Sequence, residues 1–253
     1  MVEADNALAK RVWGPWATVG FGLVIGIASF IVQILVAIVV GIVIYTSNPG
    51  LTSEEFIPEF IAVNGLQTTI ATIASAIIGG GFILVVIILR KGISVKEYLG
   101  LRKISRKAVF LSLAVVIALI VISDLTSYVL GRPINTDFMV EIYNTSVSPV
   151  LLWLAIVIFA PVFEEGFFRG FMFGGFINSR LGVVGTVFLT SLIWVLLHMQ
   201  YGVFELFILF VSGILLGIAR YKTGSLWTPL LMHSFMNAIA MLEVAISINS
   251  LIG

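Results

Sequence analysis

Residues 150–177 read VLLWLAIVIFAPVFEEGFFRGFMFGGFI, a stretch that is apolar except for Glu164, Glu165 and Arg169 near its middle. About 20 mostly apolar residues in a helix cross the roughly 30 Å of hydrocarbon in a bilayer, so this stretch is long enough to span a membrane. An ionisable side chain inside such a span costs a few kcal/mol. We therefore expect a membrane helix that carries charged residues at its centre for a functional reason.

Six more apolar stretches of comparable length are separated by short polar breaks. They lie at residues 17–45, 66–89, 109–130, 183–201, 203–219 and 229–251. The composition agrees, because 60% of the residues are hydrophobic and only 11% are charged, too few to cover a folded domain in water. The sequence predicts an all-α, polytopic membrane helix bundle with about seven transmembrane helices, in which the closely spaced last four are antiparallel neighbours.

Lysine and arginine gather on one side of this predicted bundle. If the N-terminus is cytoplasmic, segments on that side hold 12 of the 14 basic residues, many of them in the stretch 90–107. The loop at residues 46–65 holds Glu54, Glu55 and Glu59 and no basic residue. Because positive residues accumulate in short cytoplasmic loops, we expect the N-terminus inside and the C-terminus outside, in the plasma membrane if the source is prokaryotic. For the stretch 90–107 we favour a solvated loop, with an interfacial helix on anionic lipid as the alternative.

Composition also limits the chemistry. The chain has no cysteine, which excludes disulfides and thiolate zinc sites, and its 14 basic and 13 acidic residues give no sign of a nucleic-acid partner. Outside the last four spans the only ionisable residue within a span is Asp124, which we interpret as part of a helix–helix hydrogen-bond patch with Ser123, Thr126 and Ser127. Any reaction must use carboxylates, hydroxyls, amides and the two histidines.

The charged residues of 150–177 fall on different faces of the expected helix. Glu165 and Arg169 are four apart and share a face, so we expect them to form an ion pair. Glu164 lies about 100° round the helix and must find its partner on another helix. Pro161 is expected to kink the helix one turn before the acids and to open room for water.

Both histidines lie in the last spans, each four residues from a second polar or aromatic side chain. Trp194 precedes His198, and Asn237 follows His233. A single such pair is commonly an interhelical hydrogen bond, but two carboxylates, two imidazoles and an amide on three neighbouring helices favour a functional site. For His233 to be level with the acids, the segment 221–228 has to dip into the membrane, buried in protein or lining a cavity.

At these residues the sequence resembles the CPBP family of intramembrane proteases, also called the Abi family, which includes the type II CAAX prenyl proteases. The resemblance covers about residues 150–237, and three motifs of the family occur in its order. They are Glu-Glu-x-x-x-Arg at Glu164, Glu165 and Arg169, aromatic-x-x-x-His at Trp194 and His198, and His-x-x-x-Asn/Asp at His233 and Asn237. Tryptophan at position 194 replaces the more common phenylalanine and keeps a bulky aromatic ring there.

The resemblance implies an all-helical membrane domain whose catalytic cavity opens toward the cytoplasm. It implies a membrane-embedded protease that hydrolyses a peptide bond of a membrane-bound peptide or lipidated protein, such as a prenylated CAAX-type substrate. Residues 1–149 would then hold the N-terminal transmembrane helices and the cytoplasmic basic loop, and residues 150–253 the catalytic core. By resemblance, Glu164 and His198 activate water, His233 and Asn237 bind the developing oxyanion, and Glu165, Arg169 and Trp194 support them.

The residues leave alternatives open. We favour a glutamate mechanism without a metal, and the alternative is a divalent metal such as zinc held by Glu164, His198 and His233. A non-proteolytic membrane regulator or scaffold of the same family is the main rival function. A proton-coupled transporter is a second rival, because buried glutamate and histidine also serve proton relays. Polar residues that only hold helices together are the third, and the oligomeric state is not predicted.

Overall fold

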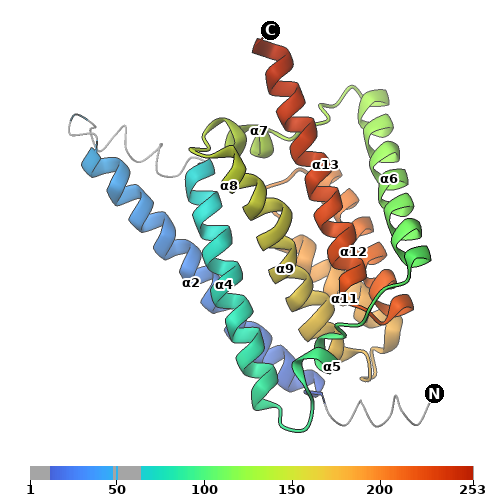
Figure 1. The fold of residues 1–253 in the computed structure, drawn as a ribbon. Coiled ribbons are helices and arrows are strands. Elements are labelled where there is room, and N and C mark those ends of the chain that lie inside the picture. The colour runs from blue at the N-terminus through green and yellow to red at the C-terminus, as the bar shows by residue number, and fades with distance from the viewer. Residues whose placement is uncertain (1–11, 48–49, 51–63, 253) are drawn as a thin grey trace.

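The structure is a computed structural model that describes residues 12–47, 50 and 64–252. In that part of the chain every regular element is helical (Figure 1). The acidic residues Glu54, Glu55 and Glu59 of the predicted outer loop, together with Lys10 and Arg11, lie outside the described residues.

Five helices run unbroken through the bundle, a sixth changes its winding along its length, and three are short. The unbroken helices are α2 (Pro15–Ser47), α4 (Gly65–Leu89), α6 (Arg106–Val129), α12 (Val203–Thr223) and α13 (Trp227–Ile252). The central helix is formed by α8 (Pro149–Leu154), η1 (Ala155–Phe159), α9 (Ala160–Glu165), η2 (Gly166–Met172) and α10 (Phe173–Phe176). The short helices are α5 (Val95–Leu99), α7 (Asp137–Asn144) and α11 (Gly182–Leu196).

Six of the described helices are long and apolar enough to cross a membrane, which confirms the all-α, multi-pass class. The expected seventh span, 183–201, forms only the 15-residue helix α11, followed by turns from residue 197 onward. At 1.5 Å per residue such a helix is about 22 Å long, shorter than the roughly 30 Å of hydrocarbon. A seventh complete span is therefore not confirmed.

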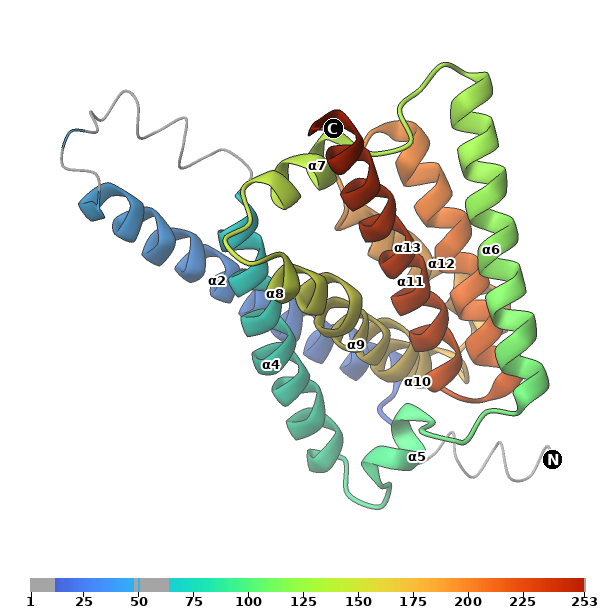
Figure 2. The ribbon, with the colours of Figure 1, turned by 45° about the horizontal axis from the view of Figure 1, so that its top comes forward.

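The helix that contains both glutamates lies in the middle of the bundle, between α4 and α13 (Figures 1 and 2). Its two π-helical segments, η1 and η2, flank the α-helical turn of Pro161 and Glu164. Proline has no amide hydrogen for the helix ladder, and π turns, which insert an extra residue, are frequent at functional sites. The structure therefore has an irregularity near Pro161, as expected, and it is a π-helical turn that ends at Phe159.

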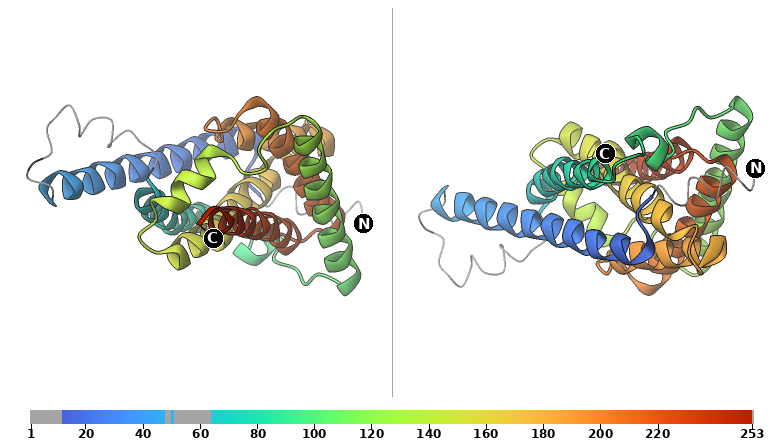
Figure 3. Two further views of the ribbon diagram at one scale, coloured as in Figure 1. Left: turned by 90° about the horizontal axis from the view of Figure 1, so that it is seen from above. Right: turned by 90° about the horizontal axis from the view of Figure 1, so that it is seen from below.

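The helices α2 and α4 pack closely against each other and against this central helix. Figure 3 shows that the C-terminal part of α2 extends away from the rest of the bundle. Close approach depends on Gly79 of α4, because a Cβ there would lie 2.7 Å from Oγ of Ser29 and closer still to the ring of Phe163. Gly80, the next residue, has open space around it.

The basic stretch 90–107 is not a plain solvated loop, because it contains α5, which packs onto the bundle. Tyr98 and Leu99 of α5 are buried. Two glycines of the central helix permit this contact, since Gly170 meets Leu99 and Gly174 meets Tyr98. Burial raises the pKa of Tyr98 to about 12, so its hydroxyl stays neutral at physiological pH.

The close α2–α4–α9 packing predicts different effects of the same substitution at neighbouring glycines. Gly79→Ala should lower the free energy of unfolding by about 1–3 kcal/mol, because the new methyl group overlaps Ser29 and Phe163. Gly80→Ala should be neutral or stabilising by up to about 1 kcal/mol, since alanine is the better helix former and meets nothing. Thermal unfolding of detergent-solubilised protein measures both, and equal shifts would contradict the packing.

Candidate active site

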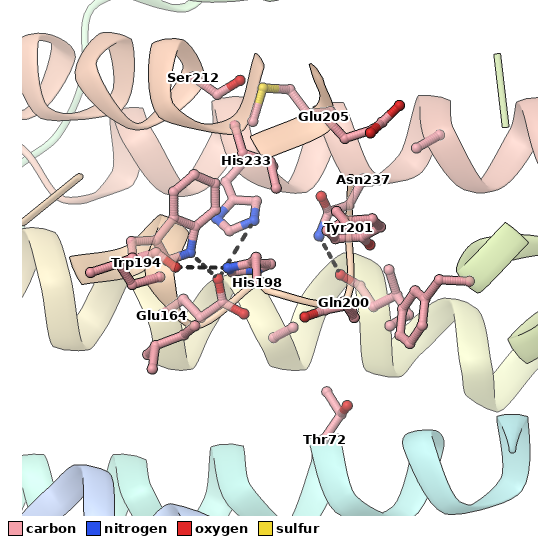
Figure 4. Close-up of a pocket in the computed structure, with 18 of the residues that line it drawn as sticks. Thr72, Glu164, Trp194, His198, Gln200, Tyr201, Glu205, Ser212, His233 and Asn237 are labelled. Atoms are coloured by element: carbon pink, nitrogen blue, oxygen red, sulfur yellow. Dashed lines mark hydrogen bonds and ion pairs between the residues drawn. The ribbon is translucent and has the colours of Figure 1, made fainter. Parts of the chain in front are cut away.

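All three motifs reach one cavity of about 1390 Å³ in the middle of the bundle (Figure 4). It is bounded by α2, α4, α6, α7, the central helix, α11, α12 and α13. Five motif residues line it: Glu164, Trp194, His198, His233 and Asn237. The other two, Glu165 and Arg169, lie behind the cavity wall and are completely buried.

Glu165 and Arg169 form the predicted i, i+4 ion pair, with 3.0 Å between Oε1 and Nη1. Arg169 also donates a hydrogen bond of 2.9 Å to the carbonyl of Gly213 on α12, and its guanidinium lies 5.1 Å from the centre of the Trp194 ring. A buried charge that loses its partner costs several kcal/mol. The pair therefore neutralises Glu165 and ties the central helix to α11 and α12.

Glu164 finds its partners on other helices, as predicted. The indole nitrogen of Trp194 on α11 donates a hydrogen bond to its Oε2. The Nε2 atom of His233 on α13 lies 4.0 Å from the same oxygen (Figure 4). The side chain of Glu164 remains 21% exposed, whereas that of Glu165 is 0% exposed, so only Glu164 is accessible from the cavity.

His233 connects the two glutamates. Its Nδ1 atom lies 2.9 Å from Oε1 of Glu165, while its Nε2 faces Glu164. The segment 221–228 leads into α13, which carries His233. That connection is buried at Ser225, Leu226 and Thr228, and the backbone nitrogen of Leu226 donates a hydrogen bond to the carbonyl of Gly100 beside α5.

His198 and Asn237 are both held by backbone carbonyls. The Nδ1 atom of His198 lies 2.8 Å from the Trp194 carbonyl, and its ring stacks on Tyr201 with 6.2 Å between centroids. The amide of Asn237 donates a 2.8 Å hydrogen bond to the carbonyl of Ile156 in η1. An amide nitrogen has two hydrogens, so one remains for another acceptor.

The described residues do not form a metal-ligand set. No group of three His, Asp or Glu side chains in residues 12–47, 50 and 64–252 is arranged to hold a metal ion. The Nδ1 atoms of His233 and His198 are engaged by Glu165 and by the Trp194 carbonyl, so Nε2 is the remaining nitrogen of each ring. Because Glu164, His198 and His233 do not converge as a group of three ligands, we assign no step to a metal.

Several residues of the site were not predicted. Tyr201 supports the ring of His198, and Arg220 donates a 2.9 Å hydrogen bond from Nε to the carbonyl of Arg169 in η2. Arg220 is buried, although its position near the end of an apolar stretch suggested only a cytoplasmic charge. Asp124, interpreted as a helix–helix patch, lines the cavity together with Ser123 and Ser127.

Comparisons with known proteins agree with the motifs. Residues 146–239 match the family model of the type II CAAX prenyl endopeptidase Rce1-like proteins. An uncharacterised 24.3 kDa protein of Escherichia coli is 34% identical over 114 residues, which cover 42% of this chain and 50% of that protein. The chain thus aligns with about half the length of this curated relative. No solved structure matches.

The matched region contains every motif residue from Glu164 to Asn237, and the structure brings all of these residues to or directly behind one cavity. The chain thus carries an Rce1-like type II CAAX prenyl endopeptidase domain of the CPBP (Abi) family, as its three motifs predicted.

Proposed function

We propose that the protein is an intramembrane endopeptidase that hydrolyses a peptide bond of a membrane-bound peptide or lipidated protein. The proposal rests on the different surroundings of the two glutamate side chains. Glu165 is buried and paired with Arg169, whereas Glu164 faces the cavity and is held by Trp194. A positioned carboxylate that a water molecule can reach is what general-base catalysis requires.

In the proposed reaction Glu164 removes a proton from water, the resulting hydroxide attacks the scissile carbonyl, and the same proton passes to the leaving amine. His198 supports the first step. Because its Nδ1 lies against the Trp194 carbonyl, which can only accept, this nitrogen carries the hydrogen in the neutral ring. Its Nε2 is then an acceptor that can orient the attacking water.

His233 and Asn237 are proposed to stabilise the oxyanion. Glu165 accepts the hydrogen on Nδ1 of His233, so donation from Nε2 requires the imidazolium form. That form also balances the charges of the site, because His233 and Arg169 then match the two glutamates. Asn237 adds its remaining amide hydrogen. Donors placed in a dry site before the reaction are worth about 2.7–4 kcal/mol each to the transition state.

Changing Glu164 to Gln should abolish turnover while leaving folding nearly unchanged, because the substitution removes the base and keeps the shape. We expect a loss of at least about 100-fold in cleavage rate. The matched control is Glu141→Gln, an exposed glutamate of α7 outside the cavity lining, which should cleave normally.

The measurement compares membranes that contain active protein with membranes that contain the Glu164→Gln variant, by mass spectrometry of newly formed peptide ends. Reconstituted protein is then tested on the peptides so identified. If the Glu164→Gln variant still cleaves at a near-normal rate, a residue other than Glu164 is the general base. If no cut depends on the protein at all, the chain is a non-proteolytic member of its family.

The substitution Arg169→Ala should mainly lower the stability of the folded protein. It leaves Glu165 buried without its cation, and we expect the free energy of unfolding to fall by about 3–5 kcal/mol. The control is Arg132→Ala, which breaks the similarly short ion pair with Glu205, where the two side chains are 41% and 23% exposed, and should cost about 1 kcal/mol or less. Denaturant unfolding in detergent measures the free energy of unfolding of both variants. If both variants lose a similar amount, the buried pair stabilises the fold no more than the exposed pair does.

Exhaustive chelation should leave cleavage unchanged, because the arrangement of the donors does not fit a metal site. Elemental analysis of active, detergent-purified protein before and after chelation provides the check. Stoichiometric zinc whose removal stops turnover and whose return restores it would instead make His198 and His233 ligands. Glu164 would be essential under either mechanism.

A further inference from the structure

The π-helical turn η1 leaves one backbone carbonyl without its α-helical donor. The amide of Ala160 donates a hydrogen bond to the carbonyl of Ala155, the spacing of a π-helix. In an α-helix that amide would bond to the carbonyl of Ile156. The side chain of Asn237 on α13 donates to the Ile156 carbonyl instead, with 2.8 Å between Nδ2 and the oxygen. A motif residue of the site thus completes the hydrogen bonding of the first π-helical turn.

The second π-helical turn, η2, leaves a similar gap, and Arg220 of α12 fills it. The amide of Phe173 donates to the carbonyls of Phe168 and Gly170. It passes over the carbonyl of Arg169, to which it would donate in an α-helix. Nε of Arg220 donates a 2.9 Å hydrogen bond to that carbonyl. Arg220 thus does for η2 what the motif asparagine does for η1.

Arg220 is a buried cation whose charge meets carbonyl dipoles and an aromatic ring. Its exposed fraction is 8%, and no Asp or Glu of residues 12–47, 50 and 64–252 forms an ion pair with it. Its Nη2 lies 3.3 Å from the carbonyl of Leu99, and its guanidinium lies 5.5 Å from the centre of the Phe173 ring. An apolar side chain would fill this space without the cost of burying a charge. The carbonyls that the guanidinium binds are therefore the physical reason for a cation here.

A series of contacts leads from Arg220 to the imidazole that faces Glu164. Arg220 holds the carbonyl of Arg169, whose guanidinium pairs with Glu165 at 3.0 Å. Glu165 in turn lies 2.9 Å from Nδ1 of His233. Return of η2 to α-helical winding would turn the side chains before and after it by about 100° relative to each other. By satisfying the open carbonyl, Arg220 keeps Arg169 aligned with Glu165 and His233.

We infer that Arg220 is a positioning residue of the active site. It stabilises the π-helical winding of η2, keeps the ion pair of Glu165 and Arg169 in place, and through that pair sets the orientation of the His233 imidazole. The inference rests on the proposed function and adds to it a residue outside the three motifs. Arg220 does not line the cavity, so its effect on a substrate passes through these neighbours.

Histidine-selective ¹⁵N labelling tests the inference without any catalysis, because the chain has only two histidines. The variant His198→Gln leaves one imidazole and so assigns the signals of His233. The quantities measured are the chemical shift of Nδ1 and the rate at which its hydrogen exchanges with water. Arg220→Met removes every side-chain donor and keeps an apolar chain of similar length. Its matched control is Lys222→Met, which removes an exposed cation from the same last turn of α12.

We expect Arg220→Met to shift the Nδ1 signal of His233 and to accelerate exchange of its hydrogen by about 10-fold or more, because the bond to Glu165 is weakened. On a cleaved peptide, the turnover number should fall on the order of 10- to 100-fold and KM should change less than about twofold, since the geometry of reaction is lost and not the binding. Arg220→Lys, which keeps one donor group, should lie between Arg220→Met and the natural protein. Lys222→Met should change none of these quantities.

Two glycines allow Arg220 to be displaced without being replaced. Gly100 and Gly92 both have φ in the left-handed region, +68° and +94°, so alanine strains the backbone at either position. A Cβ at Gly100 would overlap the guanidinium of Arg220, whereas a Cβ at Gly92 meets nothing within 4 Å. We expect Gly100→Ala to move the His233 signal in the same direction as Arg220→Met, and Gly92→Ala to leave it unchanged.

An unchanged His233 signal in folded Arg220→Met protein would overturn the inference and leave the protease in place, as would a shifted signal with a normal turnover number. Equal shifts of both histidine signals would also overturn it, because Arg220 would then serve the fold as a whole. Loss of folded protein in Arg220→Met, Arg220→Lys and Gly100→Ala alike would have the same meaning. A shifted His233 signal in a protein that cleaves no peptide would overturn the protease and leave the positioning of His233 intact.

Discussion

The buried ion pair between Glu165 and Arg169 is the constraint on which the rest of the site depends. It places two charges at 0% exposure in the centre of a membrane bundle, where only mutual pairing and further hydrogen bonds make burial tolerable. Arg169 reaches the carbonyl of Gly213 on α12, and Glu165 reaches His233 on α13. One pair thus fixes three helices and orients the imidazole that faces Glu164.

Much of this could be predicted from spacing alone. Residues four apart share a helix face, so the pairing of Glu165 with Arg169 and the separate direction of Glu164 followed from the sequence. Hydrophobic length identified six of the spans. The motifs located the residues of the cavity, because a functional charge in lipid stands out against apolar neighbours.

What could not be predicted depends on contacts between distant segments. The π-helical turns, the early end of α11 at Leu196 and the burial of α5 arise from packing that no local pattern encodes. Arg220 resembles a loop cation in sequence, yet its guanidinium donates to backbone carbonyls of Arg169 and Leu99.

The proposed mechanism depends on Glu164 acting as a base on water, while Arg169 neutralises the charge of the neighbouring Glu165. A single turnover in water enriched in ¹⁸O, with enzyme in excess over a cleaved peptide, tests it most directly. The claim predicts that the new carboxylate of the product carries one ¹⁸O atom and that Glu164 carries none. An unlabelled product together with ¹⁸O in the Glu164 side chain would contradict it, because the glutamate would then have attacked the peptide bond itself.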